Sequence, residues 1–325
     1  MRRMAEELMT VLEPRPQQGF VETGYVRDIM ARAYSYLEAG FPVHFRGGSG
    51  TGKTTFAMHL AYLVGRPVML IHGDEEFSTS NLVGGEHGYR LRKVVDNFIH
   101  SVLKTEEDFV RRWVDNRLTL ACKHGFTLIY DEFTRSRPEA NNVLLSILQE
   151  RMLDLPEARG GENYLRVDPD FRAIFTSNPE EYAGTHKAQD ALRDRMVTID
   201  LDHFDRDTEV GITQARSGLP QEEAGRIVDL VRAFRERGHY EFSPTVRAPI
   251  MIAKVTRSRQ AAAYASDAFF REVCLDMLRS ESSRSGVRSD GRETRELIEG
   301  LIEEFCGSPA AHPQAVSPQP VPADA

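Results

Sequence analysis

Five short stretches of the chain are almost continuously apolar. They fall at residues 43–45, 68–71, 126–130, 173–176 and 196–201. Strands that are covered on both faces by helices show such continuous runs, whereas strands with one exposed face alternate between apolar and polar positions. The pattern therefore predicts an α/β fold, in which helices sandwich a parallel five-stranded sheet.

Helical periodicity fills much of the remaining sequence. Residues 141–152 place Leu144, Leu145, Leu148 and Met152 on one face of a predicted helix. After residue 204 the strand signal stops, and the chain favours a small all-helical domain. Its amphipathic helices are predicted at residues 221–238, 246–255, 268–278 and 293–305.

The two ends of the chain depart from this pattern. Residues 1–18 predict a short helix that Pro14 and Pro16 end, followed by a linker. Residues 307–325 are rich in Pro and Ala without periodicity, which is typical of disorder. We therefore expect four parts: an N-terminal helix and linker (1–18), an α/β domain (19–203), a helical domain (204–306) and a disordered tail (307–325).

Composition narrows the class of protein. The net charge of -8 gives no reason to expect a protein that wraps nucleic acid. The three cysteines, Cys122, Cys274 and Cys306, are far apart without CxxC spacing, which favours a reducing cytoplasm over a disulfide framework or a zinc site. No apolar run approaches the ~20 residues of a membrane-spanning helix, and no apolar stretch after the N-terminal arginines indicates a signal peptide.

One glycine-rich motif indicates a binding site for a nucleoside triphosphate. Residues 47–54 read GGSGTGKT between an apolar run and a helical stretch, which is the context that distinguishes a phosphate loop from a surface loop. Glycines turn backbone N–H groups toward phosphate oxygens, and the helix N-terminus adds a positive dipole. Lys53 is expected to reach the β- and γ-phosphates, and the Thr54 hydroxyl to bind Mg²⁺. The nucleotide-binding candidates are Gly47, Gly48, Ser49, Gly50, Thr51, Gly52, Lys53, Thr54 and Thr55.

A pair of acidic residues follows the third apolar run. In a parallel sheet, Asp131 and Glu132 would lie at the same edge as the phosphate loop. We expect Asp131 to hold Mg²⁺ through water, and Glu132 to orient and polarise the attacking water. A solvated turn that carries two acids is the alternative, and the nearby phosphate loop makes it the weaker one.

The order of these motifs resembles the AAA+ ATPases. The phosphate loop is followed by LIYDE at residues 128–132 and IFTSNP at residues 174–179. DEFTRSRPEANNVLLSILQER and ALRDRM are similar to the MoxR branch, which includes ATPases that activate nitric oxide reductase and rubisco. FVETGYVRDIMARAYSYLEAGFPVHFRGGSGTGKTTFA and LVGGEHGYR resemble the gas vesicle protein N family more closely, and the resemblance covers most of residues 19–260.

The resemblance assigns three further residues. Asn178 matches the sensor-1 position, where an amide contacts the γ-phosphate or the attacking water; a plain Asn-Pro turn is the alternative. Arg195 matches the arginine finger that reaches a neighbouring subunit's site, with Arg193 as a substitute. A surface arginine paired to Asp194 is the other reading of Arg195. Arg247 matches the sensor-2 arginine, although two residues separate it from Pro244 where the family has a tighter spacing.

The family also implies an architecture and a role. It implies a sheet order of 5-1-4-3-2, a helical lid, ATP and Mg²⁺ as cofactors, and a homo-oligomeric ring, most often a hexamer. The implied role is that of a cytoplasmic assembly ATPase for gas vesicles, with other gas vesicle proteins as partners and with neither nucleic acid binding nor membrane insertion. A MoxR-type chaperone for a client enzyme, a nucleotide-gated scaffold with negligible turnover and a DNA-directed ATPase are the alternatives.

Two remaining features have less specific interpretations. Residues 89–113 are basic and aromatic, which fits either an insert that grips a client or amphipathic helices with a solvated charged face; the second is favoured. His72, His100 and His124 lack metal-ligand spacing and are interpreted as structural or surface residues.

Overall fold

The computed structural model describes residues 11–95, 104–155, 163–178, 190–238, 243–282 and 291–307. The chain divides into two compact units. The first comprises Met1–Gln18 and Gly24–Asp202, and the second comprises Gly19–Thr23 and His203–Ala325. None of the described helices is long and apolar enough to cross a bilayer.

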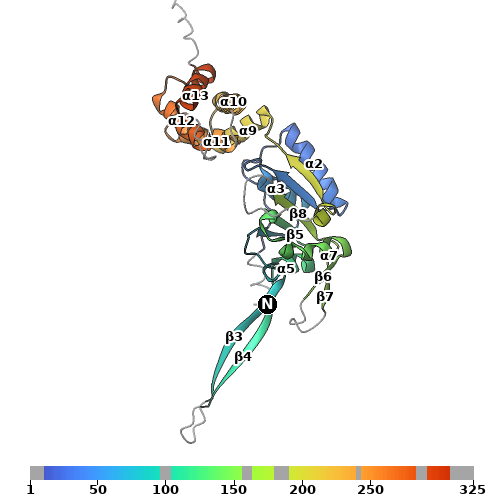
Figure 1. The fold of residues 1–325 in the computed structure, drawn as a ribbon. Coiled ribbons are helices and arrows are strands. Elements are labelled where there is room, and N and C mark those ends of the chain that lie inside the picture. Colours follow the sequence, from blue (N-terminus) through green and yellow to red (C-terminus); the bar gives the residue numbers. More distant parts are fainter. Residues whose placement is uncertain are drawn as a thin grey trace, which may run out of the picture. The chain divides into compact units, whose positions relative to one another are not determined.

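A parallel five-stranded sheet forms the centre of the first unit (Figure 1). Its strands run in the spatial order β2-β5-β8-β1-β9, which is the expected order 5-1-4-3-2 when these five strands are numbered along the chain. All four neighbouring pairs are parallel, so the carboxyl ends of the strands meet at one edge. The strands are β1 (Val43–Gly47), β2 (Val68–His72), β5 (Thr127–Asp131), β8 (Arg172–Ser177) and β9 (Val197–Leu201).

Helices cover both faces of this sheet, as the continuous apolar runs predicted. Leu128 and Tyr130 of β5 share one core cluster with residues of α5 (Arg117–His124) and α7 (Val143–Glu150). On the other face Phe45 of β1 contacts Phe56 of α3 (Lys53–Val64), with ring centroids 6.0 Å apart. Every residue of β5 is buried, because its side chains point alternately into two cores. The helix α2 (Gly24–Glu38) packs against α3 and β1.

The helix predicted over residues 141–152 is shorter than expected. The short helix α6 (Pro138–Asn141) precedes α7, which ends at Glu150 because Arg151 adopts the left-handed conformation with φ 55°. Its buried face consists of Leu144 and Ile147. Met152 instead begins β6 (Met152–Asp154), where it is 39% exposed and pairs antiparallel with β7 (Tyr164–Arg166).

The described residues of the basic and aromatic stretch form two antiparallel strands, so the preferred helical interpretation was wrong. After the short helix α4 (Thr79–Val83), strands β3 (Gly84–Val95) and β4 (Lys104–Asp115) pair antiparallel along their whole length (Figure 1). The sequence of these strands is rich in Val, Tyr, Phe and Trp, which have high strand propensity. The spacing of charged residues therefore predicted the wrong type of secondary structure in this stretch.

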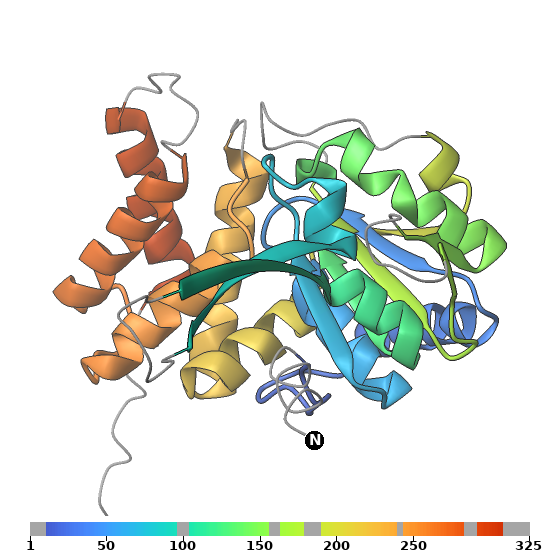
Figure 2. The same ribbon diagram turned by 90° about the horizontal axis from the view of Figure 1, so that it is seen from below.

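The second unit is helical (Figure 2). Its core consists of buried residues that include Ile227, Phe234, Ile252, Leu278 and Ile302. The four predicted helices correspond to α10–α13, and α9 precedes them without having been predicted. The helices are α9 (Arg206–Ser217), α10 (Gln221–Arg237), α11 (Arg247–Ser258), α12 (Ala268–Ser282) and α13 (Gly291–Cys306).

The predicted terminal segments fall largely outside the described residues. Residues 1–10 of the expected N-terminal helix and residues 308–325 of the expected tail are not described. Leu12, which the helix was expected to include, makes an antiparallel bridge to Val68 of β2, with main-chain hydrogen bonds of 2.9 and 2.8 Å.

A buried carboxylate ties the second unit together. Glu209 of α9 is 1% exposed and forms ion pairs with Arg232 and Arg235 of α10, at 3.1 and 2.9 Å. The two guanidinium groups also donate to the carbonyl oxygens of Phe204 and Pro244. Because a buried charge is stable only with such partners, this network holds the chain before α9 and the chain before α11 against α10.

The strand β1 carries a buried histidine whose ring joins three strands. His44 is 3% exposed, and its Nε2 lies 2.8 Å from Ser177 Oγ on β8 while its Nδ1 lies 3.1 Å from Thr198 Oγ1 on β9. Burial, followed by the positive charges of Arg46 and Arg193, lowers the pKa of His44 from 6.5 to about 4. The ring is therefore neutral in the folded protein at neutral pH.

This pKa predicts an acid-sensitive fold. The unfolded chain takes up a proton at His44 near pH 6.5 and the folded chain only near pH 4, so the free energy of unfolding should fall as pH drops through that window. The loss attributable to His44 should reach about 3 kcal/mol near pH 4. Denaturant titrations of wild type and His44→Gln should show a stability difference that shrinks from pH 7 to pH 4. A difference that does not change with pH would contradict the assignment.

Candidate active site

The phosphate loop joins the end of β1 to the start of α3. Gly50 and Gly52 adopt φ values of 77° and 83°, a left-handed region that favours glycine. A Cβ at Gly47 would lie 2.2 Å from the carbonyl oxygen of Leu201 on β9, so a side chain at this position is excluded. The loop backbone can therefore curl inward as a cradle for phosphate oxygens.

The side chains of the loop point into it. Thr51 Oγ1 donates to the carbonyl oxygen of Gly48 at 2.9 Å, and the ammonium group of Lys53 donates to the same oxygen. Lys53 is only 9% exposed, so its positive charge is concentrated inside the loop at the N-terminus of α3. This arrangement suits an anion with several oxygens.

The structure brings Thr54 and Asp131 together from different elements. Thr54 Oγ1 on α3 donates to Asp131 Oδ1 at the end of β5, at 2.8 Å. Asp131 is 7% exposed, and its second oxygen lies 3.4 Å from His72 Nδ1 at the end of β2. A hydroxyl and a carboxylate oxygen at this spacing are ligands of the type that Mg²⁺ prefers.

Glu132 lies at a sharp turn beside this carboxylate. Its φ of 52° is left-handed, which is uncommon for a residue with a side chain and is frequent at functional sites. Its backbone N–H donates to Thr176 Oγ1 at 2.8 Å, and its carboxylate accepts from Arg135 Nη1 at 2.8 Å. Arg135 belongs to the 3-10 helix η1 (Phe133–Arg135), which begins directly after the turn.

Two residues that sequence reasoning missed support this turn. Thr176 of β8 binds Glu132 as described, and Gly73 donates its N–H to the carbonyl oxygen of Asp131 at 2.7 Å. A Cβ at Gly73 would lie 2.1 Å from the carbonyl oxygen of Glu132, so the turn requires glycine there. Thr176 ends the apolar run 173–176, and Gly73 comes shortly after the run 68–71. Their position at the ends of predicted parallel strands, as for the acidic pair, was the sequence signal that could have identified them.

The site residues that the family resemblance assigned lie in several different elements. Asn178 directly follows β8 and is 6% exposed, at the same sheet edge as Asp131. Arg193 is exposed at the end of the short helix α8 (Asp190–Arg193). Arg195 follows it and donates to Gln149 Oε1 of α7 at 2.9 Å and to the carbonyl oxygen of Ala191. Arg247 is the first residue of α11 in the second unit.

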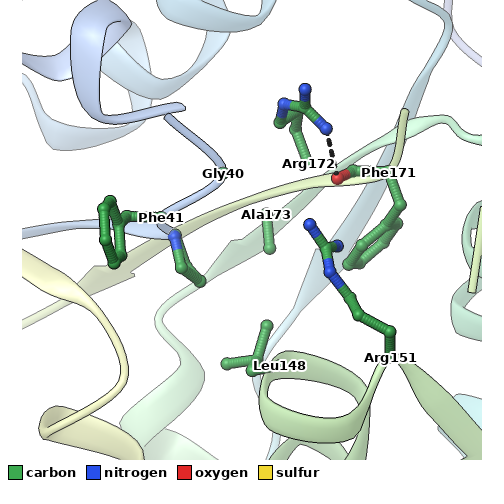
Figure 3. A pocket seen from close by; sticks show the side chains of 8 residues that line it. Gly40, Phe41, Leu148, Arg151, Phe171, Arg172 and Ala173 are labelled. Atoms are coloured by element: carbon green, nitrogen blue, oxygen red, sulfur yellow. Dashed lines mark hydrogen bonds between the residues drawn. The ribbon is translucent and has the colours of Figure 1, made fainter. Parts of the chain in front are cut away.

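A small hollow lies at the opposite edge of the sheet (Figure 3). Its lining comes from the segments that enter β1 and β8, together with the end of α7. Ligands of open parallel sheets bind at the carboxyl ends of the strands, so this hollow is not the candidate active site. The residues that line it are Gly40, Phe41, Pro42, Leu148, Arg151, Phe171, Arg172 and Ala173.

Comparison with known proteins agrees with this geometry. Residues 42–196 match the family model for the AAA domain of the dynein-related subfamily. The gas vesicle ATPase GvpN of Ancylobacter aquaticus is 52% identical over 94% of this chain and 86% of its own length. GvpN1 of Halobacterium salinarum is 42% identical over 89% of this chain and 81% of its own length. The chain belongs to the gas vesicle ATPase GvpN family.

The chain is also similar to a more distant relative. Protein NorQ of Paracoccus denitrificans is 28% identical over 59% of this chain and 62% of its own length. As a member of the GvpN family with an AAA domain, the chain is an ATPase that binds nucleotide.

The close contact at Gly73 predicts a substitution with a local effect. Gly73→Ala forces a methyl group against the Glu132 carbonyl, so it should lower the free energy of unfolding by about 1–3 kcal/mol and should also reduce ATP turnover by displacing the Glu132 turn. Gly24→Ala is the matched control, because a Cβ at Gly24 meets no atom within 4 Å. Equal stability and equal turnover in the two variants, measured by denaturant titration and phosphate release, would refute the prediction.

Proposed function

We propose that this protein is a Mg²⁺-dependent ATPase that serves as an assembly or remodelling factor in gas vesicle formation. The similarity to relatives named gas vesicle ATPase, at 52% identity over 94% of the chain, is the observation that supports this role best. The lower identity of 28% to NorQ makes a MoxR-type chaperone of a client enzyme the weaker alternative.

The phosphate loop is proposed to bind ATP through the main chain and the side chain of Lys53. Backbone N–H groups of Gly47–Thr55 bind the α- and β-phosphates, and Lys53 binds the β- and γ-phosphates. Arg247 is proposed as a further nucleotide-binding residue. The left-handed glycines and the buried ammonium group support this assignment.

Thr54 and Asp131 are proposed to hold Mg²⁺. The Thr54 hydroxyl would bind the ion directly, and Asp131 would bind it through water. Their oxygen atoms are 2.8 Å apart and chemically suited to Mg²⁺. Among the residues that the structure describes, no group of three or more His, Cys, Asp or Glu side chains could hold a metal by itself. Water molecules and phosphate oxygens of the substrate would complete the coordination, and the bound Mg²⁺ would supply positive charge against the phosphates.

Glu132 and Asn178 are proposed to act on the attacking water. The carboxylate of Glu132 is 38% exposed at the site edge, so it can orient a water molecule and accept its proton. The amide of Asn178 would hydrogen-bond the same water or the γ-phosphate. Arg135 pairs with Oε2 of this carboxylate, and an ionised carboxylate has further lone pairs that can accept a hydrogen from the water.

Arg195 is proposed to complete the site of a neighbouring subunit. This role implies a homo-oligomeric ring, with a hexamer as the expected size, and Arg193 is the alternative finger. A guanidinium group there would neutralise charge that develops on the γ-phosphate. The expected partners are other gas vesicle proteins, in the cytoplasm and in association with the vesicles, without nucleic acid binding or membrane insertion.

The role of Glu132 predicts a trapped state. Glu132→Gln should lower the turnover number at least about 100-fold because it removes the general base, and it should keep nucleotide affinity. Glu139→Gln is the control, since Glu139 is an exposed acid of the same segment. Phosphate release and binding of a fluorescent ATP analogue measure the two quantities. Turnover in Glu132→Gln equal to that of the control would exclude Glu132 as the base.

A shared site predicts complementation between inactive subunits. Arg195→Ala alone should lose turnover about 1000-fold while it still binds ATP. Mixed with Glu132→Gln subunits, it should regain turnover, because its intact Glu132 can then meet the neighbour's intact Arg195. Failure of every mixing ratio to restore phosphate release, in mixed oligomers verified by mass, would place the arginine in its own subunit's site. Arg193→Ala in the same assay decides between the two arginines.

A further inference from the structure

The hydroxyl group of Thr176 makes two hydrogen bonds at the carboxyl edge of the sheet. Thr176 lies on β8 and is completely buried. Its Oγ1 donates to Asp131 Oδ1 at 2.6 Å and accepts the backbone N–H of Glu132 at 2.8 Å. A hydroxyl carries one hydrogen and two lone pairs, so both bonds can exist at once.

The first bond fixes the orientation of the Asp131 carboxylate. Oδ1 accepts hydroxyl hydrogens from Thr54 at 2.8 Å and from Thr176 at 2.6 Å. Oδ2 therefore faces the side of the site where His72 lies at 3.4 Å. Without Thr176, the carboxylate would keep a single hydroxyl donor and could rotate.

The second bond fixes the start of the Glu132 turn. The ladder between β5 and β8 ends at the pair Tyr130 and Phe175, and the chain then turns into the left-handed region at Glu132. The N–H of Glu132 would lack an acceptor from the ladder, and a buried N–H without one is costly. The Thr176 side chain supplies this acceptor. It thereby fixes the position of the Glu132 main chain, from which the carboxylate side chain extends.

We propose that Thr176 is a positioning residue for ATP hydrolysis. Its hydroxyl holds both acidic residues against β8, the strand that leads directly to Asn178. The proposed Mg²⁺-binding carboxylate of Asp131, the proposed base Glu132 and the proposed γ-phosphate contact Asn178 are thereby fixed relative to one another. This inference rests on the roles proposed above for Asp131, Glu132 and Asn178.

A matched pair of isosteric substitutions tests the proposal. Thr176→Val replaces the hydroxyl with a methyl group, and Thr127→Val makes the same change at a fully buried residue of β5. The hydroxyl of Thr127 has no hydrogen-bond partner among the described residues, so its loss should leave turnover unchanged. Thr176→Val should lower the turnover number roughly 10- to 100-fold through misplacement of reacting groups, with ATP affinity within about threefold of wild type.

Two further measurements separate positioning from a general loss of structure. Thr176→Ser keeps the hydroxyl and should retain turnover within about threefold of wild type, whereas Thr176→Ala should not. Unfolding of the nucleotide-free variants, followed by circular dichroism, shows that each is folded at the assay temperature. The Mg²⁺ concentration for half-maximal nucleotide binding should rise in Thr176→Val and stay unchanged in Thr127→Val.

The outcomes distinguish this inference from the proposed function. Turnover in Thr176→Val equal to that in Thr127→Val would overturn the positioning role, provided that wild type hydrolyses ATP and Glu132→Gln does not. Equal loss in the Ser and Ala variants would also overturn it, and this comparison holds if the Val variant does not fold. Absence of turnover in wild type would instead refute the proposed ATPase role of the acidic pair.

Discussion

One carboxylate oxygen, Asp131 Oδ1, holds the candidate site together. It accepts hydroxyl hydrogens from Thr54 on α3 and from Thr176 on β8, so three separate elements meet at this atom. Hydrogen bonds to a charged acceptor are worth about 1.5–3 kcal/mol each, more than those between neutral groups. The arrangement is possible because the parallel sheet brings the carboxyl ends of β1, β5 and β8 to the same edge.

Close approach of main chains at this edge limits which residues can occupy it. Gly47 lies against β9 and Gly73 lies against the Glu132 turn, in both cases closer than a Cβ would permit. Glu132 itself adopts a left-handed conformation at a cost of about 1–2 kcal/mol. The hydrogen bond from its N–H to Thr176 and the bond from Gly73 to Asp131 offset a cost of this size, since each contributes about 1 kcal/mol. Close main-chain packing at this edge therefore requires the two glycines, and it also holds Glu132 in its strained conformation.

Buried ionisable groups behave differently in the two units because their surroundings differ. His44 is surrounded by hydroxyl groups and lies in the field of two arginines, so it stays neutral and the pKa of its ring falls to about 4. Glu209 is equally buried, but two guanidinium groups contact its carboxylate directly. Desolvation disfavours charge at both positions, and only direct opposite charges can compensate for it. The first unit thus uses a neutral bridge between strands, and the second an ion-pair cluster between helices.

The sequence by itself determined the five core strands, four helices of the second unit, the phosphate loop and the acidic pair. These features are local, because burial on both faces produces a continuous apolar run and a phosphate cradle requires a fixed glycine spacing. The tertiary structure decided that Met152 belongs to a strand, that residues 84–95 pair with residues 104–115 as antiparallel strands, and that Arg195 contacts Gln149. The tertiary structure also placed Thr176 and Gly73 where they support the Glu132 turn. Hydrogen-bond partners and close contacts depend on which strands become neighbours, and residues 44 or more positions apart leave no local pattern that records such a pairing.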